Sequence, residues 1–132
     1  VDLRYNSGGD SRLLEPLVDG LGALQDEQGF SIDVLIGEGT FSSALMNAMH
    51  FKKRTNARLV GGPSGGSLNH YGETRNFSLP NSKIPVSYST KHFVMDKTYQ
   101  TGSLVPDLVI GKTVDDILVG RDTVVEALLQ SY

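Results

Sequence analysis

The sequence predicts an α/β domain with a mixed sheet and flanking helices. Short strand-like runs alternate with amphipathic helical stretches, a glycine-rich turn follows each of the first three runs, and two longer runs flank a short polar turn. Alternating strands and helices favour a partly parallel sheet, and the paired runs favour a hairpin. A length of 132 residues and an apolar fraction of 39% fit a single domain spanning residues 1–132.

The elements follow one another from the N-terminus. Each expected strand is a β-branched or apolar run bounded by glycine, proline or asparagine. Each expected helix has apolar residues at intervals of three and four positions. We expect strands at 1–5, 30–36, 57–62, 74–80, 84–95 and 106–110, and helices at 10–27, 40–54 and 113–131, the last divided in two at Gly120.

The first two helices supply much of the expected core. Asp10 or Ser11 suits the N-cap of the first helix, Pro16 falls early in it, and Gly29 closes it. The second ends in three cationic residues, which suit the negative end of the helix dipole. The apolar faces are expected to comprise Leu13, Leu14, Leu17, Val18, Leu21 and Leu24 in the first helix, and Phe41, Leu45, Ala48 and Met49 in the second.

Composition excludes several classes of function. A formal charge of −3 and a pI near 5.5 argue against a nucleic-acid partner. No apolar run approaches the roughly 18 residues that cross a bilayer, so we expect no integral membrane segment. The absence of cysteine excludes disulfides, thiolate metal sites and a cysteine nucleophile. The histidines and carboxylates are not spaced as metal ligands, and we predict no cofactor.

Three glycine-rich turns mark the candidate site. They span 6–9, 37–39 and 61–66, each at the C-terminal end of an expected strand, where open α/β sheets bind ligands. Glycine allows a sharp turn there and leaves backbone N–H groups accessible, as an oxyanion hole requires. An ordinary glycine after a strand explains each turn alone, whereas the three together favour a site.

The serines near these turns have competing interpretations. Ser42 opens the second helix, so it is either a helix cap or a nucleophile at the positive end of the helix dipole. Ser67 lies in the third turn, where ordinary turn chemistry also explains a serine. Ser64 lies in "GPSGG", which matches the Gly-x-Ser-x-Gly nucleophile pattern, but the following "SLNHYGE" does not read as the helix that this pattern needs. We therefore reject Ser64.

A serine nucleophile needs a base, and the three histidines differ in their suitability. His50 lies two helical turns beyond Ser42, about 12 Å away at 1.5 Å per residue, and cannot reach it. His92 alternates within an expected strand, as a surface or packed residue does. His70, three residues after Ser67, is the histidine that could reach the Ser42 corner.

Several segments resemble one family, in the same order along the chain. "VDLRYNSGG" resembles the Asp-Leu-Arg-x-Asn-x-Gly-Gly segment of the C-terminal processing, or tail-specific, serine peptidases and their tricorn-like relatives. "GEGTFSSALMNAM" resembles their strand-to-helix corner with the nucleophilic serine. "ARLVGGPSGGS" resembles the strand and glycine-rich loop that follow, and "GSLVPDLVI" resembles their Val-Pro-Asp strand. The likeness covers nearly the whole chain.

The resemblance implies a spiral α/β domain of the Clp-protease/crotonase type that hydrolyses peptide or protein substrates through an acyl-enzyme. By position it implies that Ser42 is the nucleophile, and that the backbone N–H groups of Gly9 and Ser43 form the oxyanion hole. Because the chain begins in mid-strand without methionine, we expect residues 1–132 to be the C-terminal catalytic core of a longer peptidase-like chain. Members of the family are often exported or associated with the cell envelope, and we expect the same here.

Two positions depart from the processing peptidases. Their general base is a lysine in the glycine-rich loop, where this chain has Ser67, and the absence of lysine between Lys53 and Lys83 excludes such a Ser–Lys dyad. The tricorn-like branch instead uses a histidine from upstream, supported by a serine and a glutamate. Ser67 and Gln100, the latter at the position of that glutamate, are therefore the further candidate catalytic residues. A glutamine can orient an imidazole but cannot stabilise an imidazolium as a carboxylate does.

The leading hypothesis is thus a serine peptidase core whose base is an upstream histidine, which predicts that residues 1–132 alone are inert. A second version uses His70 as the base and predicts activity that His70→Ala abolishes. The competing class is a non-catalytic binding module of the same fold for apolar ligands or peptides. Acyl-CoA chemistry of the crotonase kind ranks last, because it requires neither the Asp-Leu-Arg segment nor the serine corner.

Overall fold

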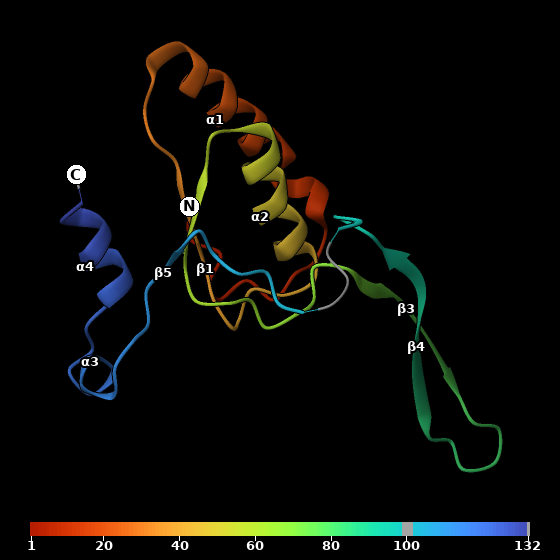
Figure 1. Ribbon diagram of the computed structural model, residues 1–132. Helices are drawn as coiled ribbons and strands as arrows, with labels where there is room; N and C mark the ends of the chain where they lie inside the picture. Colours follow the sequence, from red (N-terminus) through yellow and green to blue (C-terminus); the bar gives the residue numbers. More distant parts are fainter. Residues whose placement is uncertain (99–101, 132) are drawn as a thin grey trace.

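The computed structural model describes residues 1–98 and 102–131 and has a mixed α/β fold with flanking helices (Figure 1). Its centre is a parallel sheet in the order β1–β2–β5, made of β1 (Asp33–Ile36), β2 (Arg58–Gly61) and β5 (Leu108–Val109). An antiparallel hairpin of β3 (His70–Ser78) and β4 (Pro85–Phe93) projects from this body. The predicted mixed sheet with flanking helices is confirmed.

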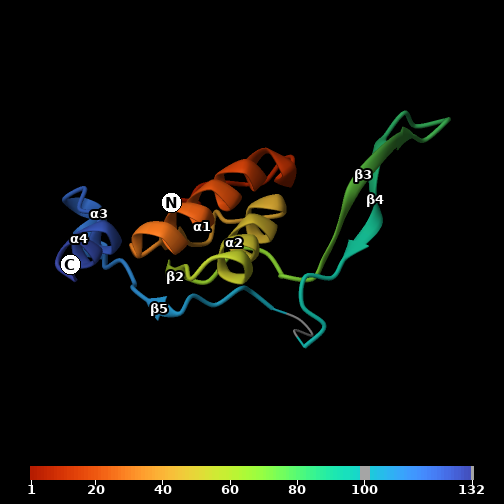
Figure 2. The ribbon, with the colours of Figure 1, turned by 90° about the horizontal axis from the view of Figure 1, so that it is seen from above.

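Both faces of the parallel sheet are covered, which explains why its central strands read as apolar runs without alternation. Helices α1 (Glu15–Gln28) and α2 (Ser43–Arg54) pack on one face, and α4 (Thr123–Leu129) packs on the other. Figure 2 shows α3 (Val114–Leu118) and α4 at one end of the molecule and the hairpin at the other. The first core includes Val18, Val34, Ile36, Leu45, Phe51 and Leu59, and the second consists of Leu35, Val60, Val124 and Leu128.

The predicted first helix is two elements in the structure. A 3₁₀ turn, η1 (Ser11–Leu14), precedes α1, because Pro16 lacks an N–H and suits only the first turn of an α-helix. Asp10 caps η1 by accepting a hydrogen bond from the backbone N–H of Arg12. Gly29 ends α1 with φ 72°, as predicted.

The predicted apolar stripe of this helix is only partly buried. Val18 is buried, and Leu14 and Leu21 are half-buried against the core. The other three leucines are exposed, because the buried face of α1 is formed by Val18 together with Gly22 and Gln25. The expectation of six buried positions was wrong for Leu13, Leu17 and Leu24.

The second helix begins at Ser43, three residues later than predicted. Thr40 is buried, and its hydroxyl donates to the Leu3 carbonyl oxygen at 2.8 Å while accepting from the Gly37 N–H at 3.0 Å. These bonds fix residues 37–40 as a turn. Phe41 therefore precedes the helix and is half-exposed, whereas Leu45, Ala48 and Met49 are buried as predicted.

The expected N-terminal strand is reduced to one parallel bridge between Asp2 and Leu35 beside β1. Its Arg4 side chain is buried and makes paired hydrogen bonds to Asp2 and to Asp122, the N-cap of α4. Hydrogen bonds from Arg4 hold the pKa of Asp122 at about 2. This ion pair joins the first residues of the chain to its last helix.

The hairpin forms around residues 81–83 as predicted, but β3 begins four residues earlier, at His70. The sequence did not indicate strand structure at residues 70–73, because Gly72 weakens the strand pattern there. The division of the C-terminal helices at Gly120, which has φ 68°, is confirmed. Among the described helices, none combines the length and apolarity needed to span a membrane.

Candidate active site

The three glycine-rich turns meet at one edge of the sheet, as predicted. Gly39 packs so closely on the residues just before the first turn that an added Cβ would lie 2.5 Å from the Arg4 carbonyl oxygen. An added Cβ on Gly65 would overlap the carbonyl oxygen of Glu38. The turns therefore pack backbone to backbone, which side chains at these positions would prevent.

Ser42 stands at the N-terminus of α2 in an unusual conformation. Its backbone has φ 52° and ψ −121°, and its side chain makes no capping hydrogen bond. A non-glycine residue in this region costs of order 1–3 kcal/mol and persists only when its surroundings impose it. An ordinary helix cap accepts a hydrogen bond from a backbone N–H. Ser42 makes no such bond, so the structure does not support its interpretation as an ordinary cap.

The first glycine-rich turn imposes this conformation from the opposite side. The Phe41 N–H donates to the Asn6 carbonyl oxygen at 3.1 Å, which ties the turn to the residue before Ser42. An added Cβ at Gly8, which has φ 110°, would lie 2.8 Å from Ser42 Cβ. Gly8 is thus the residue that allows the turn to pack directly against the serine.

A cavity of about 830 Å³ opens beside this corner. Its walls come from the residues around η1, the N-terminus of α2 and the base of the β3–β4 hairpin. The lining includes Gly9, Ser42, Ser43, His70, Glu73 and Lys91. The described hydrogen bonds include none from the N–H groups of Gly9 and Ser43; in an α-helix the first N–H groups have no intrahelical partner.

Of the three histidines, His70 alone lines this cavity. Its Nδ1 lies 3.3 Å from the Leu68 carbonyl oxygen, and its ring stacks on Phe93 with the centroids 5.6 Å apart. His92 stacks on the exposed ring of Tyr71 instead. His70, which the sequence indicated as the histidine that could reach the Ser42 corner, thus lines the same cavity as Ser42.

The cavity also contains charged residues that the sequence did not bring forward. Lys91 Nζ lies 3.4 Å from the Glu73 carboxylate and 4.6 Å from the centroid of the Phe93 ring. Across the cavity, hydrogen bonds from Arg12 lower the pKa of Asp10 to about 2. Strict alternation from His70 selects Gly72 and Thr74 and not Glu73, which lines the cavity although it is left out of the β3–β4 pairing and has φ 52°. No sequence pattern indicated this irregularity.

Ser67 and Gln100 are the two further candidates from the sequence. Ser67 forms an isolated bridge with Ser103 and does not appear among the described residues that line the cavity. Gln100 lies outside the described residues. Ser64 is buried, donates to the Gly66 carbonyl oxygen at 2.8 Å and accepts from the Leu104 N–H at 2.8 Å. Its hydroxyl therefore has a structural use, in agreement with its rejection as a nucleophile.

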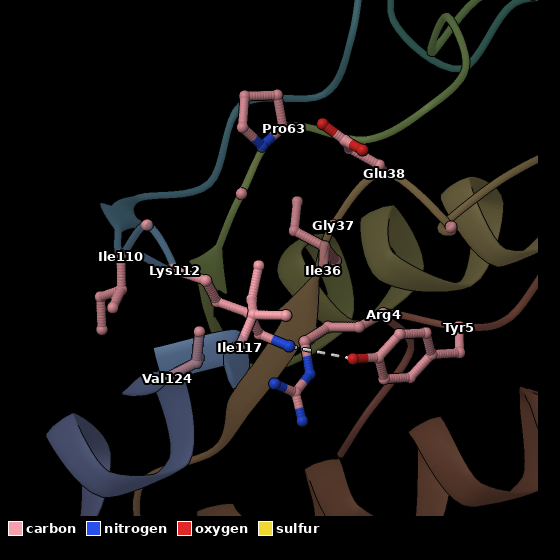
Figure 3. Close-up of a pocket in the computed structure, with 13 residues that line it drawn as sticks. Arg4, Tyr5, Ile36, Gly37, Glu38, Pro63, Ile110, Lys112, Ile117 and Val124 are labelled. Carbon is pink, nitrogen blue, oxygen red and sulfur yellow. Dashed lines mark hydrogen bonds between the residues drawn. The ribbon is translucent and has the colours of Figure 1, made fainter. Parts of the chain in front are cut away.

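A second cavity, of about 450 Å³, lies beyond the ends of β1 and β2 (Figure 3). Its walls are mainly apolar, with Ile36, Ile110 and Val124 among them. Lys112 Nζ donates to the Tyr5 hydroxyl at 3.0 Å at one side. The described lining contains no serine or histidine, in contrast to the cavity beside Ser42.

Comparisons with known proteins bear on the fold. No family model matches the chain, and no curated protein matches it. Three solved structures are similar. A candidate peptidase from Parabacteroides merdae is 25% identical with a TM-score of 0.57, over 76% of this chain and 31% of that one. A candidate S41 protease from Bacteroides fragilis is 18% identical with a TM-score of 0.65, over 98% and 43%. Mature CPAF is 24% identical with a TM-score of 0.53, over 66% and 17%.

The chain spans less than half the length of each of these three proteins. Their likeness confirms the predicted fold class. The 132 residues have the Clp-protease/crotonase-like fold of S41 protease domains.

Proposed function

We propose that the chain is the catalytic core of a serine-type peptidase of the tail-specific family, in its tricorn-like branch, and that it hydrolyses peptide bonds through an acyl-enzyme on Ser42. The observation that carries the proposal is the conformation of Ser42. Its backbone has φ 52°, its side chain does not cap α2, and it lines a cavity large enough for a peptide segment. A hydroxyl held in this way at a helix N-terminus suits attack on a carbonyl carbon.

The proposed reaction has two steps, the acylation of Ser42 and the hydrolysis of the acyl-enzyme. Ser42 Oγ forms a bond to the substrate carbonyl carbon as its proton passes to a base, and the carbonyl electron pair moves onto oxygen. The N–H groups of Gly9 and Ser43 then donate to that oxyanion. The C–N bond breaks as the base returns the proton to the leaving amine, and water releases the acyl group by the same steps in reverse.

Backbone strain supports this location. Three non-glycine residues among those described have positive φ: Ser42, Glu73 and Lys83. Lys83 lies in the turn of the hairpin, where a left-handed residue is ordinary. The other two line the cavity. Strained residues are frequent at functional sites, where the surrounding structure holds them in otherwise unfavourable conformations.

The proposal has two versions, which differ in the residue that acts as the general base. The resemblance implies a histidine from a region that precedes Val1, with Ser67 and Gln100 in supporting positions. Within this account residues 1–132 are the C-terminal core of a longer chain, which the greater length of the similar structures supports. The second version takes the base from the cavity itself, where His70 lies.

The test is hydrolysis of an unfolded protein such as casein by the full-length chain. We expect Ser42→Ala to lower the rate by a factor of at least about 10³, because removing a nucleophile leaves only binding and the oxyanion hole. Ser31→Ala, at an exposed serine outside the cavity, is the matched control and should retain the rate. Equal rates for Ser42→Ala and the unsubstituted protein would contradict the proposal.

A second candidate function is the binding of an apolar ligand without catalysis. The mainly apolar cavity in Figure 3 favours it. Ser67 stands where the processing peptidases have their lysine base, and the loss of that base is expected in a site without catalysis. In that case the full-length chain would hydrolyse nothing, and a fluorescent apolar probe would bind equally to the unsubstituted protein and to Ser42→Ala.

A further inference from the structure

Asn6 holds the first glycine-rich turn through both its side chain and its backbone. Its Oδ1 accepts a hydrogen bond from the Gly8 N–H at 3.0 Å. Its backbone carbonyl oxygen accepts from the N–H of Phe41, the residue before Ser42, at 3.1 Å, and its own N–H donates to the Leu3 carbonyl oxygen at 3.1 Å. Since the Leu3 N–H in turn donates to β1, Asn6 links the turn both to the parallel sheet and to the start of α2.

The turn needs such a restraint because two glycines follow each other in it. Gly8 has φ 110° and Gly9 has φ 139°, and glycine adopts positive and negative φ with similar ease. The sequence Gly-Gly alone therefore leaves open which way the N–H of the peptide between them points. Within the described part of the chain, the backbone of residues 7–9 makes a single hydrogen bond, the one from Gly8 to the Asn6 side chain.

The peptide that Asn6 restrains lies against the Ser42 corner. A Cβ added to Gly8 would lie 2.8 Å from Ser42 Cβ and 3.2 Å from the backbone nitrogen of Ser43. Gly9, the next residue, lines the cavity together with Ser42 and Ser43. Asn6 is not among the described residues that line this cavity, so it contacts the backbone of the site and not the space that a substrate would occupy.

We propose, on the basis of the peptidase function above, that Asn6 is a positioning residue for the oxyanion hole. By accepting from the Gly8 N–H, its side-chain amide fixes the Gly8–Gly9 peptide with the Gly9 N–H available to the oxyanion beside the Ser43 N–H. The inference holds for either version of the general base, because it concerns the oxygen that receives the carbonyl electron pair and not the proton of Ser42. One N–H donor to such an oxyanion contributes about 10²–10³-fold in kcat, so a misdirected Gly9 N–H has a measurable effect.

Asn6 also has an ordinary interpretation, because asparagine side chains often accept a hydrogen bond from the backbone two residues on and so stabilise turns. This interpretation predicts that loss of the side chain loosens the turn and slows every reaction of Ser42 to the same degree. The positioning role predicts a selective effect, on reactions in which negative charge develops on an oxygen in the hole.

The experiment compares two probes on the full-length chain, a fluorophosphonate and its thiono analogue, in which sulfur replaces the phosphoryl oxygen. In both reactions Ser42 Oγ forms a bond to phosphorus, the P–F bond breaks with loss of fluoride, and the Ser42 proton passes to the base. The phosphoryl oxygen gains negative charge in the oxyanion hole, whereas sulfur is larger and a weaker hydrogen-bond acceptor. The ratio of the two second-order rate constants for labelling of Ser42 therefore reports on the hole itself.

The proteins are the unsubstituted chain, Asn6→Ala, Asn6→Ser and the matched control Asn81→Ala, at an exposed asparagine in the hairpin turn. Circular dichroism checks that each is folded. We expect Asn6→Ala to lower the rate constant of the fluorophosphonate at least about 10-fold and that of the thiono probe much less, so that the ratio falls. A serine hydroxyl makes the same bond more weakly, so Asn6→Ser should give an intermediate ratio, and Asn81→Ala should match the unsubstituted chain.

An equal fall of both rate constants in Asn6→Ala would make Asn6 a structural residue only, and unchanged rate constants would show that the Gly9 N–H is held without it. Either result would overturn the inference and leave the peptidase proposal standing. If Asn6→Ala does not fold, the same ratio in Asn6→Ser decides. No labelling of Ser42 in the unsubstituted chain would remove the peptidase proposal and the role of Asn6 together.

Discussion

At Ser42 the backbone adopts φ 52° and ψ −121°, a conformation that costs serine energy and glycine little. Because the side chain makes no capping hydrogen bond, removing it should relieve strain without losing a contact. We expect Ser42→Gly to raise the free energy of unfolding by about 1 kcal/mol, measured by urea unfolding. The same variant should be inactive.

Ser43→Gly is the control for this prediction. Ser43 is the first residue of α2 and has no positive φ, so glycine there should lower stability by up to about 1 kcal/mol. A loss of stability in Ser42→Gly equal to that in Ser43→Gly would show that Ser42 is an ordinary helix residue after all.

Gly8 is the residue that most directly shapes the corner. An added Cβ would lie 2.8 Å from Ser42 Cβ and 3.0 Å from the Phe41 carbonyl oxygen, at a φ of 110°. We expect Gly8→Ala to destabilise the protein by about 2 kcal/mol or more and to abolish labelling of Ser42. Gly20→Ala, in the open middle of α1, should instead stabilise slightly, and thermal melting distinguishes the two. Retained labelling in Gly8→Ala would contradict the packing role given to this glycine.

Sequence reasoning selected Ser42 and His70 from the glycine-rich turns that follow the strands, and the resemblance selected Gly9 and Ser43. All four line one cavity in the structure. Sequence reasoning could not foresee the strain at Ser42, which arises from packing between the 6–9 turn and the start of α2. Ser67 was selected from its position in a resembling family, and the structure places it outside the described lining of the cavity.

At the scale of elements, Arg4 ties the N-terminal segment to α4. Its side chain is 8% exposed and bonds to Asp2 and Asp122. Since these bonds hold the pKa of Asp122 at about 2, below the value near 3.9 of an unfolded chain, the stabilisation is complete above about pH 4. It is lost as the pH falls towards 2, when Asp122 is protonated.

We therefore expect Asp122→Asn to lower the free energy of unfolding at pH 7 by about 1–2 kcal/mol, a value discounted because the carboxylate is 40% exposed. The difference from the unsubstituted protein should shrink as urea unfolding is repeated from pH 4 to pH 2.5. Asp115→Asn, at an exposed carboxylate in the first turn of α3, should cost only a few tenths of a kcal/mol. A difference for Asp122→Asn that stays constant with pH would contradict the ion-pair account.

The elements show what periodicity can and cannot predict. The order of strands and helices followed from apolar patterns, and so did the hairpin. The buried face of α1 did not, because Gly22 and Gln25 share this face with Val18 and a pattern of large apolar residues does not select them. The start of β3 was missed since glycine and asparagine residues conceal the strand that carries His70, Glu73 and one wall of the cavity.

For the whole molecule, the decisive feature is the meeting of distant segments. The cavity is formed by residues near 9–12, by the start of α2 and by both strands of the hairpin. Its shape depends on how the hairpin leaves the parallel sheet, which no local pattern encodes. The similar structures are longer than this chain, so further residues can contribute to substrate binding in the full-length protein.

The central claim is that Ser42 is an activated nucleophile. The most direct measurement is to treat the full-length, folded protein with a fluorophosphonate probe and to identify the modified residue by peptide mass. The account predicts a single adduct on Ser42 that is absent from Ser42→Ala. A folded protein that takes no label, or takes it on another serine, would contradict the claim and favour the ligand-binding function.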